Sequence, residues 1–169
     1  MTMLKSMLLA ALLAVSPIAE QDQRTWAIAV AKHQALDRSV VYRYVQKFEP
    51  GFDKRAFPTR IDILWDYDSS FGMPSDDERD RMDVAENTFV PGVERDGSAA
   101  LVYVETAEGR RQWSSYVRSE DEFMRRLNDA LSSSEALPIH VESMSDPDWA
   151  LHAEFLDGLK PQEQEESSK

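Results

Sequence analysis

The chain of 169 residues contains no cysteine. That absence excludes structural disulfides, thiolate zinc sites, iron–sulfur clusters and cysteine nucleophiles. Histidine is scarce, with three in the whole chain, and no two of them have a spacing typical of zinc ligands. The sequence also lacks a Gly-x-Ser-x-Gly nucleophile turn, a phosphate-binding loop and a dinucleotide-binding fingerprint. No catalytic constellation is recognisable, and the sequence predicts neither a cofactor nor a metal.

Basic residues are few, because 19 Lys and Arg stand against 31 Asp and Glu, for a formal net charge of -12. A nucleic-acid backbone or an anionic membrane surface would repel such a chain, so neither is expected as a partner. A protein partner, if there is one, is expected to be basic. The 42% hydrophobic and 30% charged content is that of a soluble globular protein, and the length suffices for one domain with a sizeable core.

The first residues have the pattern of a secretory signal peptide. Lys5 precedes an uninterrupted apolar run of nine residues, Met7 to Val15, and small residues follow up to Ala19. Spanning a bilayer takes about 20 apolar residues, so this run does not predict a stable membrane anchor. A buried N-terminal helix is the alternative. We expect residues 1–19 to be a signal peptide cleaved after Ala19, and the protein to be periplasmic or secreted.

The remaining chain, residues 20–159, reads as a single α+β domain. Period-two alternation and β-branched or aromatic residues mark its strands. Strands are predicted at 26–31, 40–45, 60–67, 99–105, 110–117 and 137–141. In the third of these, Ile61, Ile63 and Trp65 share one face while Asp62 and Asp66 lie on the other.

Two capping boxes predict the main helices. Ser75 caps a helix in which Glu78 reaches back to the Ser75 amide, and this helix is expected to close at Pro91-Gly92. A second box at 119–122 opens a helix that ends at 132–134. A short third helix is expected to have Asp146 as its N-cap and Pro147 at its first position, and to run to about residue 159. Residues 160–169 are polar and charged and are predicted to be a disordered tail.

The order from Arg60 to Met144 is strand, helix, strand, strand, helix, strand. This order is typical of the ferredoxin-like α+β sandwich, in which two helices cover one face of an antiparallel sheet. The two strands within residues 25–48 are expected to form an added N-terminal hairpin. The sequence does not define an oligomeric state.

Several motifs together resemble a known family over about 100 residues, from Phe57 to Leu159. They are Pro58, Gly72-x-Pro74-Ser75, Thr106-x-x-Gly109-x-Arg111-x-Trp113-x-x-Tyr116 and Asp146-Pro147-x-Trp149. The pattern is similar to that of the bacterial domain of unknown function 695 family. The resemblance implies a ferredoxin-like fold, distantly similar to a protein that inhibits ribonuclease E. It implies a protein-binding precedent and no established active site.

The candidate binding residues come from the same motifs: Arg111, Trp113, Tyr116, Asp146 and Trp149. Arg111 and Trp113 lie two apart on a strand and share a face, while Tyr116 points to the opposite face. Arginine beside tryptophan is a common composition of binding hot spots, but a core tryptophan with a stacked arginine has the same pattern. Trp113 and Trp149 are expected to act mainly through stability.

Two groups of residues could bind a metal, and each also has a simpler structural explanation. His140 and His152 could approach each other and bind zinc with Glu142 or Asp146, although their spacing does not favour it. Three aspartates at period two, Asp62, Asp66 and Asp68, could bind a hard cation. Solvent exposure of their strand face explains these aspartates equally well.

The most economical interpretation is a non-catalytic, exported module that binds a protein or peptide through the open sheet face or a free strand edge. The alternative is a small-ligand binder or enzyme with a site around Arg111, Trp113, His140 and Asp146. A pocket joining these four side chains would favour the alternative.

Overall fold

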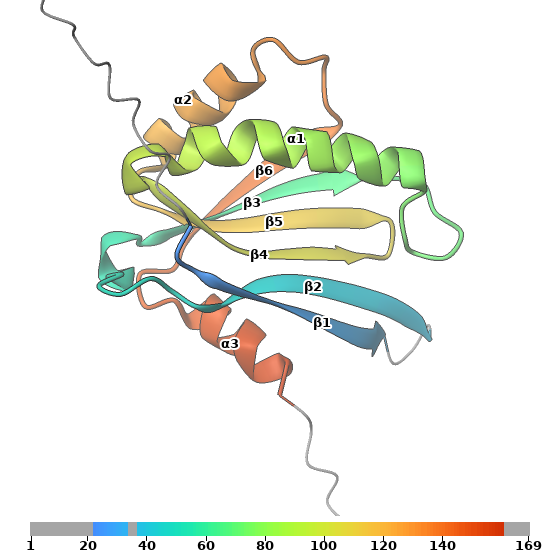
Figure 1. Cartoon of the computed structure of the whole chain (residues 1–169), viewed down its shortest axis with the longest axis horizontal. Coiled ribbons are helices and arrows are strands. Elements are labelled where there is room, and N and C mark those ends of the chain that lie inside the picture. The colour runs from blue at the N-terminus through green and yellow to red at the C-terminus, as the bar shows by residue number, and fades with distance from the viewer. Residues whose placement is uncertain (1–21, 34–36, 161–169) are drawn as a thin grey trace, which may run out of the picture.

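The computed structural model describes residues 22–33 and 37–160. They form one six-stranded sheet with two helices on one face and a shorter helix on the other (Figure 1). The predicted signal peptide at 1–19, and the predicted tail beyond Lys160, lie outside the described residues. No helix within the described ranges is long and apolar enough to cross a membrane.

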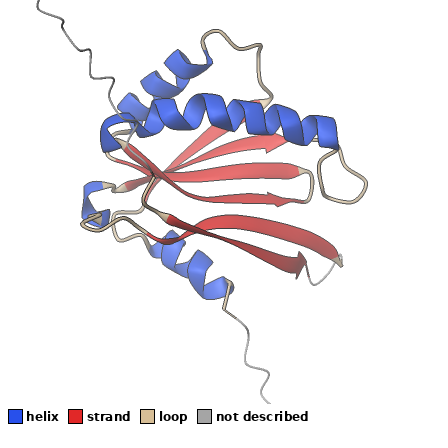
Figure 2. Cartoon of the chain, in the orientation of Figure 1, coloured by secondary structure: helices blue, strands red, loops and turns tan. Residues whose placement is uncertain are grey.

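The strands and helices follow the predicted order (Figure 2). The strands are β1 (Thr25–His33), β2 (Arg38–Lys47), β3 (Thr59–Asp66), β4 (Ala99–Ala107), β5 (Arg110–Val117) and β6 (Ile139–Ser145). The helices are α1 (Asp76–Glu94), α2 (Glu120–Leu131) and α3 (Ala150–Gly158), with short 3-10 turns at Lys54–Ala56 and Arg95–Gly97. The last strand begins later than predicted, because Pro138 cannot donate a ladder hydrogen bond.

The strand order is β1-β2-β4-β5-β3-β6, and every neighbouring pair is antiparallel. The predicted α+β sandwich is confirmed, since β3 to β6 with α1 and α2 have the split βαβ arrangement. The N-terminal hairpin extends the sheet beside β4, where Val41 lies opposite Thr106. Within the described residues, β1 and β6 are the two edges of the sheet.

The main core lies between the sheet and the two longer helices. Ile61, Ile63 and Trp65 of β3 point toward α1 and α2, as their period-two spacing predicts, and all three are buried. Met82, Phe89 and Val93 of α1 and Phe123 and Leu127 of α2 pack against them. These contacts bury the apolar faces of the sheet and of the two helices, which none of the three could bury alone.

The prediction that α1 closes at Pro91-Gly92 is wrong, because the helix continues to Glu94. Phe89 and Val93 are both buried against the sheet, and this packing holds the last turn helical despite the proline. Gly92 permits the close approach of α2, since a Cβ atom there would lie 3.0 Å from the Cβ of Ala130.

The first capping box forms only in part. The Ser75 hydroxyl accepts from the Glu78 amide at 3.2 Å, as predicted. The expected return contact is absent from the described hydrogen bonds, because the Glu78 carboxylate accepts from the Trp65 indole instead, at 2.6 Å. Trp65 is fully buried, and its N–H requires an acceptor there.

The start of α3 also differs from the prediction, because the helix begins at Ala150. Trp149 has φ +57°, in the left-handed region, so Pro147 and Asp148 belong to a turn and not to the helix. Asp146 still caps α3, but from four and five residues away, through its carboxylate and the amides of Ala150 and Leu151.

Candidate functional site

Arg111 lies on β5, on the side of the sheet that faces α1. Its guanidinium donates to Asp83 of α1 at 2.6 Å and to the Thr106 hydroxyl at 3.1 Å. The same group lies 5.9 Å from the ring centroid of Trp113. Arg111 is buried. Through Asp83 and Thr106 it connects β5 to α1 and to β4.

Trp113 lies on the same side and is fully buried. Its ring meets Phe89 of α1 edge-on, with the centroids 5.5 Å apart. Its indole N–H donates to Glu86 at 2.7 Å, and the same carboxylate pairs with Arg43 of β2. The indole is thus a part of the core that also orients Glu86.

Tyr116, Asp146 and Trp149 meet on the opposite side of the sheet. The Tyr116 hydroxyl donates to Asp146 at 2.5 Å, and the Tyr116 ring stacks on Trp149 with centroids 3.8 Å apart. The Trp149 indole donates to the carbonyls of Lys54 and Phe57, both at 3.0 Å. All three side chains are buried, so together they fasten the start of α3 to the sheet.

The electrostatics of this contact favour an ionised carboxylate beside a neutral phenol. Burial raises the pKa of Tyr116, and the Asp146 carboxylate raises it further. Burial also opposes ionisation of Asp146, but the Tyr116 hydroxyl and the amides of Ala150 and Leu151 outweigh it and lower the pKa of Asp146.

The histidines do not form a zinc site with these residues. His140 is half exposed on β6, with its ring nitrogens 3.9 Å from Asp66 and 4.0 Å from Glu142. His152 is buried beside Trp149, with the ring centroids 5.3 Å apart. Among the described residues, no group of three or more His, Asp or Glu side chains is arranged to hold a metal ion.

The structure therefore divides the five candidate residues between two sites. Arg111 and Trp113 face α1, whereas Tyr116, Asp146 and Trp149 hold α3 on the other face, and His140 lies on the edge strand β6. None of Arg111, Trp113, His140 and Asp146 lines the groove between β1 and α3 or the shallow hollow at Ala153, Glu154, Asp157 and Gly158. Both tryptophans are buried, and their contacts are those of side chains that stabilise the fold.

A buried polar cluster on the α3 side was missed from the sequence. Arg60 donates to both carboxylate oxygens of Asp62 at 2.9 Å and to the Tyr103 hydroxyl at 2.5 Å. The interpretation of this strand face as solvent-exposed is wrong for Asp62, which is 4% exposed. Period-two spacing of Arg60 and Asp62 was the available signal. Asp66 pairs with Arg110, and β3 ends there, before Asp68.

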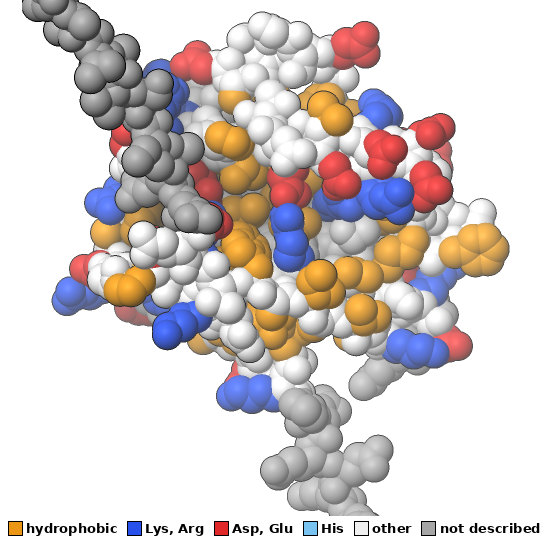
Figure 3. Space-filling view, in the orientation of Figure 1, with side chains coloured by type: hydrophobic (Ala, Val, Ile, Leu, Met, Phe, Trp, Pro, Cys, Tyr) orange, Lys and Arg blue, Asp and Glu red, His pale blue; other side chains and the backbone are white. Residues whose placement is uncertain are grey.

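The most exposed apolar side chains of the sheet are on β1. Ile28 and Val30 are 72% and 68% exposed. Ile28 lies opposite Arg43, whose guanidinium reaches Glu86 of α1, so both apolar side chains project on the α1 side. We call Trp26, Ile28, Val30 and Val41 the hairpin surface. Figure 3 shows hydrophobic side chains gathered over the hairpin and charged ones over α1.

The two edges of the sheet differ in where their charged residues lie. β6 follows Pro138 and carries His140 and Glu142. Charged residues and proline are common devices that keep an edge strand from pairing with another chain. β1 carries Lys32 and His33 at its last two positions, has no charged residue from Thr25 to Ala31, and within the described residues pairs with β2 alone. The β1 edge is thus the less protected of the two.

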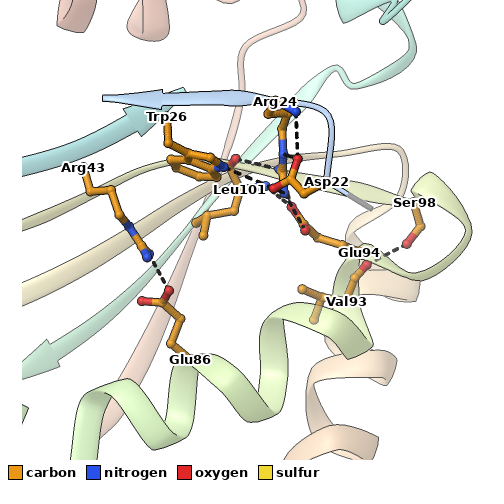
Figure 4. A network of polar contacts seen from close by, with 9 residues as sticks. All are labelled: Asp22, Arg24, Trp26, Arg43, Glu86, Val93, Glu94, Ser98 and Leu101. Carbon is orange, nitrogen blue, oxygen red and sulfur yellow. Dashed lines mark hydrogen bonds and ion pairs between the residues drawn. The ribbon is translucent and has the colours of Figure 1, made fainter. Parts of the chain in front are cut away.

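A polar network fixes the start of β1 against α1 (Figure 4). Arg24 donates to both oxygens of Glu94, at 2.7 and 3.0 Å, and Glu94 accepts from the Leu101 amide at 2.6 Å. The Trp26 ring lies between the guanidinium groups of Arg24 and Arg43, 5.1 and 5.3 Å from its centroid. The edge strand is therefore held in place by side chains from α1 and β2 and by the backbone of Leu101 in β4.

A groove of about 540 Å³ lies between the hairpin and α3, on the side opposite the hairpin surface. Its apolar lining comes from Ala29, Val30, Ala31, Tyr42, Leu151, Phe155 and Leu159. Phe155 contacts the Tyr42 ring edge-on and stacks on Tyr103 with centroids 4.0 Å apart. The groove follows β1, so both sides of this edge strand are apolar.

Comparison with protein families gives one match. The model of a family of unknown function, DUF695, matches residues 47–157. The chain belongs to this family. A search of curated proteins found no match. The matched residues include Arg111, Trp113 and Tyr116 of β5 and the turn with Asp146 and Trp149.

The hairpin lies almost entirely outside the matched range. The match begins at Lys47, the last residue of β2, so β1 and the hairpin surface precede it. Within the matched range, Arg111 and Trp113 contact α1, and Tyr116 bonds to Asp146 at the start of α3. The exposed apolar side chains of β1 belong to the added part of the sheet.

Proposed function

We propose that this chain is a non-catalytic, exported module that binds an extended protein segment by strand addition to β1. The observation that carries the proposal is the β1 edge, which has no charge from Thr25 to Ala31 and exposes Ile28 and Val30. In strand addition, backbone hydrogen bonds supply affinity, and pockets for alternate side chains supply specificity.

The anchoring of β1 supports this function. A strand that accepts a partner must be ordered before binding, because ordering it during binding would reduce affinity. Arg24, Glu94 and Trp26 hold the start of β1 against α1 and β4. The edge is thus preorganised by contacts that do not use its outward backbone groups.

The charge of the protein supports a basic partner. The net charge is -12, and the acidic side chains of α1 border the hairpin surface, with Asp83 half exposed beside Arg111. Complementary charge speeds association and excludes acidic competitors. A segment with Lys or Arg beside its apolar residues fits this border.

Selection from a phage-displayed library of random short peptides tests strand addition directly. We expect the mature chain, residues 20–169, to enrich apolar peptides that carry basic residues. Val30→Asp places a charge on the hairpin surface and is expected to weaken a selected peptide at least about tenfold. Val84→Asp is the matched control, because Val84 is 66% exposed on α1 and away from β1.

Two results would contradict the proposal. Failure to select any peptide that binds the purified protein in solution is one. Equal loss of affinity in the Val30→Asp and Val84→Asp variants is the other, because it would show that the peptide does not recognise β1.

Export is supported by the apolar run from Met7 to Val15 and the small residues up to Ala19. Cell fractionation and sequencing of the mature N-terminus test it. We expect the protein outside the cytoplasm with its N-terminus near residue 20. A cytoplasmic protein that still begins at Met1 would rule export out.

A further inference from the structure

We propose that the groove beside α3 receives every second side chain of the added strand and selects large apolar side chains there. The inference rests on the proposed function and names its ligand class. That ligand is an extended segment with large apolar residues at alternate positions and a Lys or Arg beside them. No role for this groove follows from membership of a family of unknown function.

The first step is the direction of the side chains. Ala29 lies opposite Tyr42, and the Tyr42 ring contacts Phe155 of α3, so Ala29 projects to the α3 side. Ala31, two residues on, projects the same way. A strand paired with β1 places every second side chain beside these alanines, because directly opposed residues in a sheet share a face.

The second step is the size of the space. Ala29 and Ala31 are the β1 residues on the α3 side, Val30 between them also borders the groove, and the groove has a volume of about 540 Å³. Its far wall has apolar side chains from Leu151 and Phe155 of α3 and from Leu159, which follows the helix. Short side chains on the added strand would leave this volume to water, whereas Phe, Leu, Ile or Met would bury apolar area against α3.

Size and charge also decide against a second copy of this chain as the occupant. In an antiparallel β1–β1 pair, the second copy would present its own alanines, Ala27, Ala29 and Ala31, to the groove. Three methyl groups do not fill a space of this size. Each copy also carries a net charge of -12, which opposes association of the two.

The charged rim of the groove defines the rest of the ligand. Glu154 of α3 lines the groove, is exposed and forms no ion pair with another described residue. Two cations also line the groove and are already paired, Lys160 with Asp157 at 2.6 Å and Arg60 with Asp62 at 2.9 Å. The carboxylate left to a partner is that of Glu154, and it favours a Lys or Arg next to the inserted apolar side chain.

The test measures peptide preference as well as affinity. Peptides selected on the parent are expected to carry Phe, Leu, Ile or Met at every second position. Ala31→Leu fills the groove from β1 and is expected to weaken these peptides at least about tenfold. It should bind equally well, or better, to the same peptides with Ala at the alternating positions, which a misfolded variant could not do. Glu154→Gln should reduce both affinity and its salt dependence.

The outcomes separate this inference from the proposed function. Selected peptides without alternating large apolar residues, or unchanged peptide affinity in Ala31→Leu, would overturn the groove assignment. Strand addition would still stand in that case if Val30→Asp abolished peptide binding. Loss of all peptide binding would end both. Sedimentation as a dimer that Val30→Asp dissociates would make the second copy the occupant and overturn the inference.

Discussion

The Tyr116 hydroxyl donates a 2.5 Å hydrogen bond to the carboxylate of Asp146, 30 positions away in the sequence. The same carboxylate accepts the first free amides of α3, from Ala150 and Leu151. Trp149 stacks on the Tyr116 ring from the turn between them. One buried contact therefore joins β5, the turn and α3, and its residues all lie within the range that the family matches.

This contact predicts strong coupling between Tyr116→Phe and Asp146→Asn. Tyr116→Phe is expected to lower the free energy of unfolding by about 1–3 kcal/mol, because it leaves a buried carboxylate without one donor. The double variant should lose less than the sum of the single losses, with an interaction of about 0.5–3 kcal/mol. Urea unfolding of the four proteins measures it. Additive losses would show that the short contact contributes nothing specific.

The two buried tryptophans predict large losses of stability. Trp113→Ala and Trp149→Ala are each expected to cost about 3–5 kcal/mol, since each removes a buried ring and leaves a cavity. A domain of this size has about 5–15 kcal/mol in total, so the melting temperature should fall sharply. Asp77→Ala, on the exposed side of the first turn of α1, is the control and should cost far less. Parent-like melting of both tryptophan variants would contradict their structural role.

Two glycines with positive φ allow a matched comparison. Gly109, with φ +77°, joins β4 to β5, and a Cβ atom there would lie 2.9 Å from the Tyr67 carbonyl oxygen. Gly51, with φ +84°, has nothing within 4 Å of the corresponding position. Gly109→Ala should therefore destabilise by more than Gly51→Ala, which is expected to cost about 1 kcal/mol from backbone strain alone. Chemical denaturation of both decides it, and equal losses would mean that the Tyr67 contact relaxes freely.

Local patterns were sufficient to predict most of the fold. The capping serines Ser75 and Ser119, and the alternation around Ile61 and Trp113, depend on near neighbours in sequence. Period two correctly predicted that Trp113 and Tyr116 face opposite sides. These features follow from short-range geometry, which the sequence expresses directly.

The errors at Trp149, Asp62 and the β1 edge involve distant partners. Trp149 adopts a left-handed φ because Tyr116 and the carbonyl of Phe57 fix its ring, and no local preference favours a bulky residue in that conformation. Asp62 is buried because Arg60 and Tyr103 satisfy it. The exposure of β1 likewise depends on which strands pair with it, and strand order is not a local property of the sequence.

The imidazole of His152 is surrounded by aromatic rings. Phe48, Tyr116, Trp149 and Phe155 have ring centroids within 6.4 Å of it. Its Nε2 is buried without a hydrogen-bond partner in the described part of the chain. The pKa of His152 is lowered from its ordinary 6.5 to about 4. Burial is the largest cause, the positive charges of Lys54 and Arg60 add to it, and the negative charge of Asp146 opposes it by a smaller amount.

Acid should therefore destabilise the protein through His152, starting near pH 6.5. Below pH 6.5 the unfolded chain binds a proton at His152, while the folded chain stays neutral there until about pH 4. The free energy of unfolding should fall between these values, by at most about 3 kcal/mol, and this effect should be absent above them. Urea titrations across this range measure the fall. His152→Leu should remove it, and His140→Gln, which changes a half-exposed imidazole, should keep it. A parent whose stability is constant over this window would show that His152 takes up its proton equally well in the folded state.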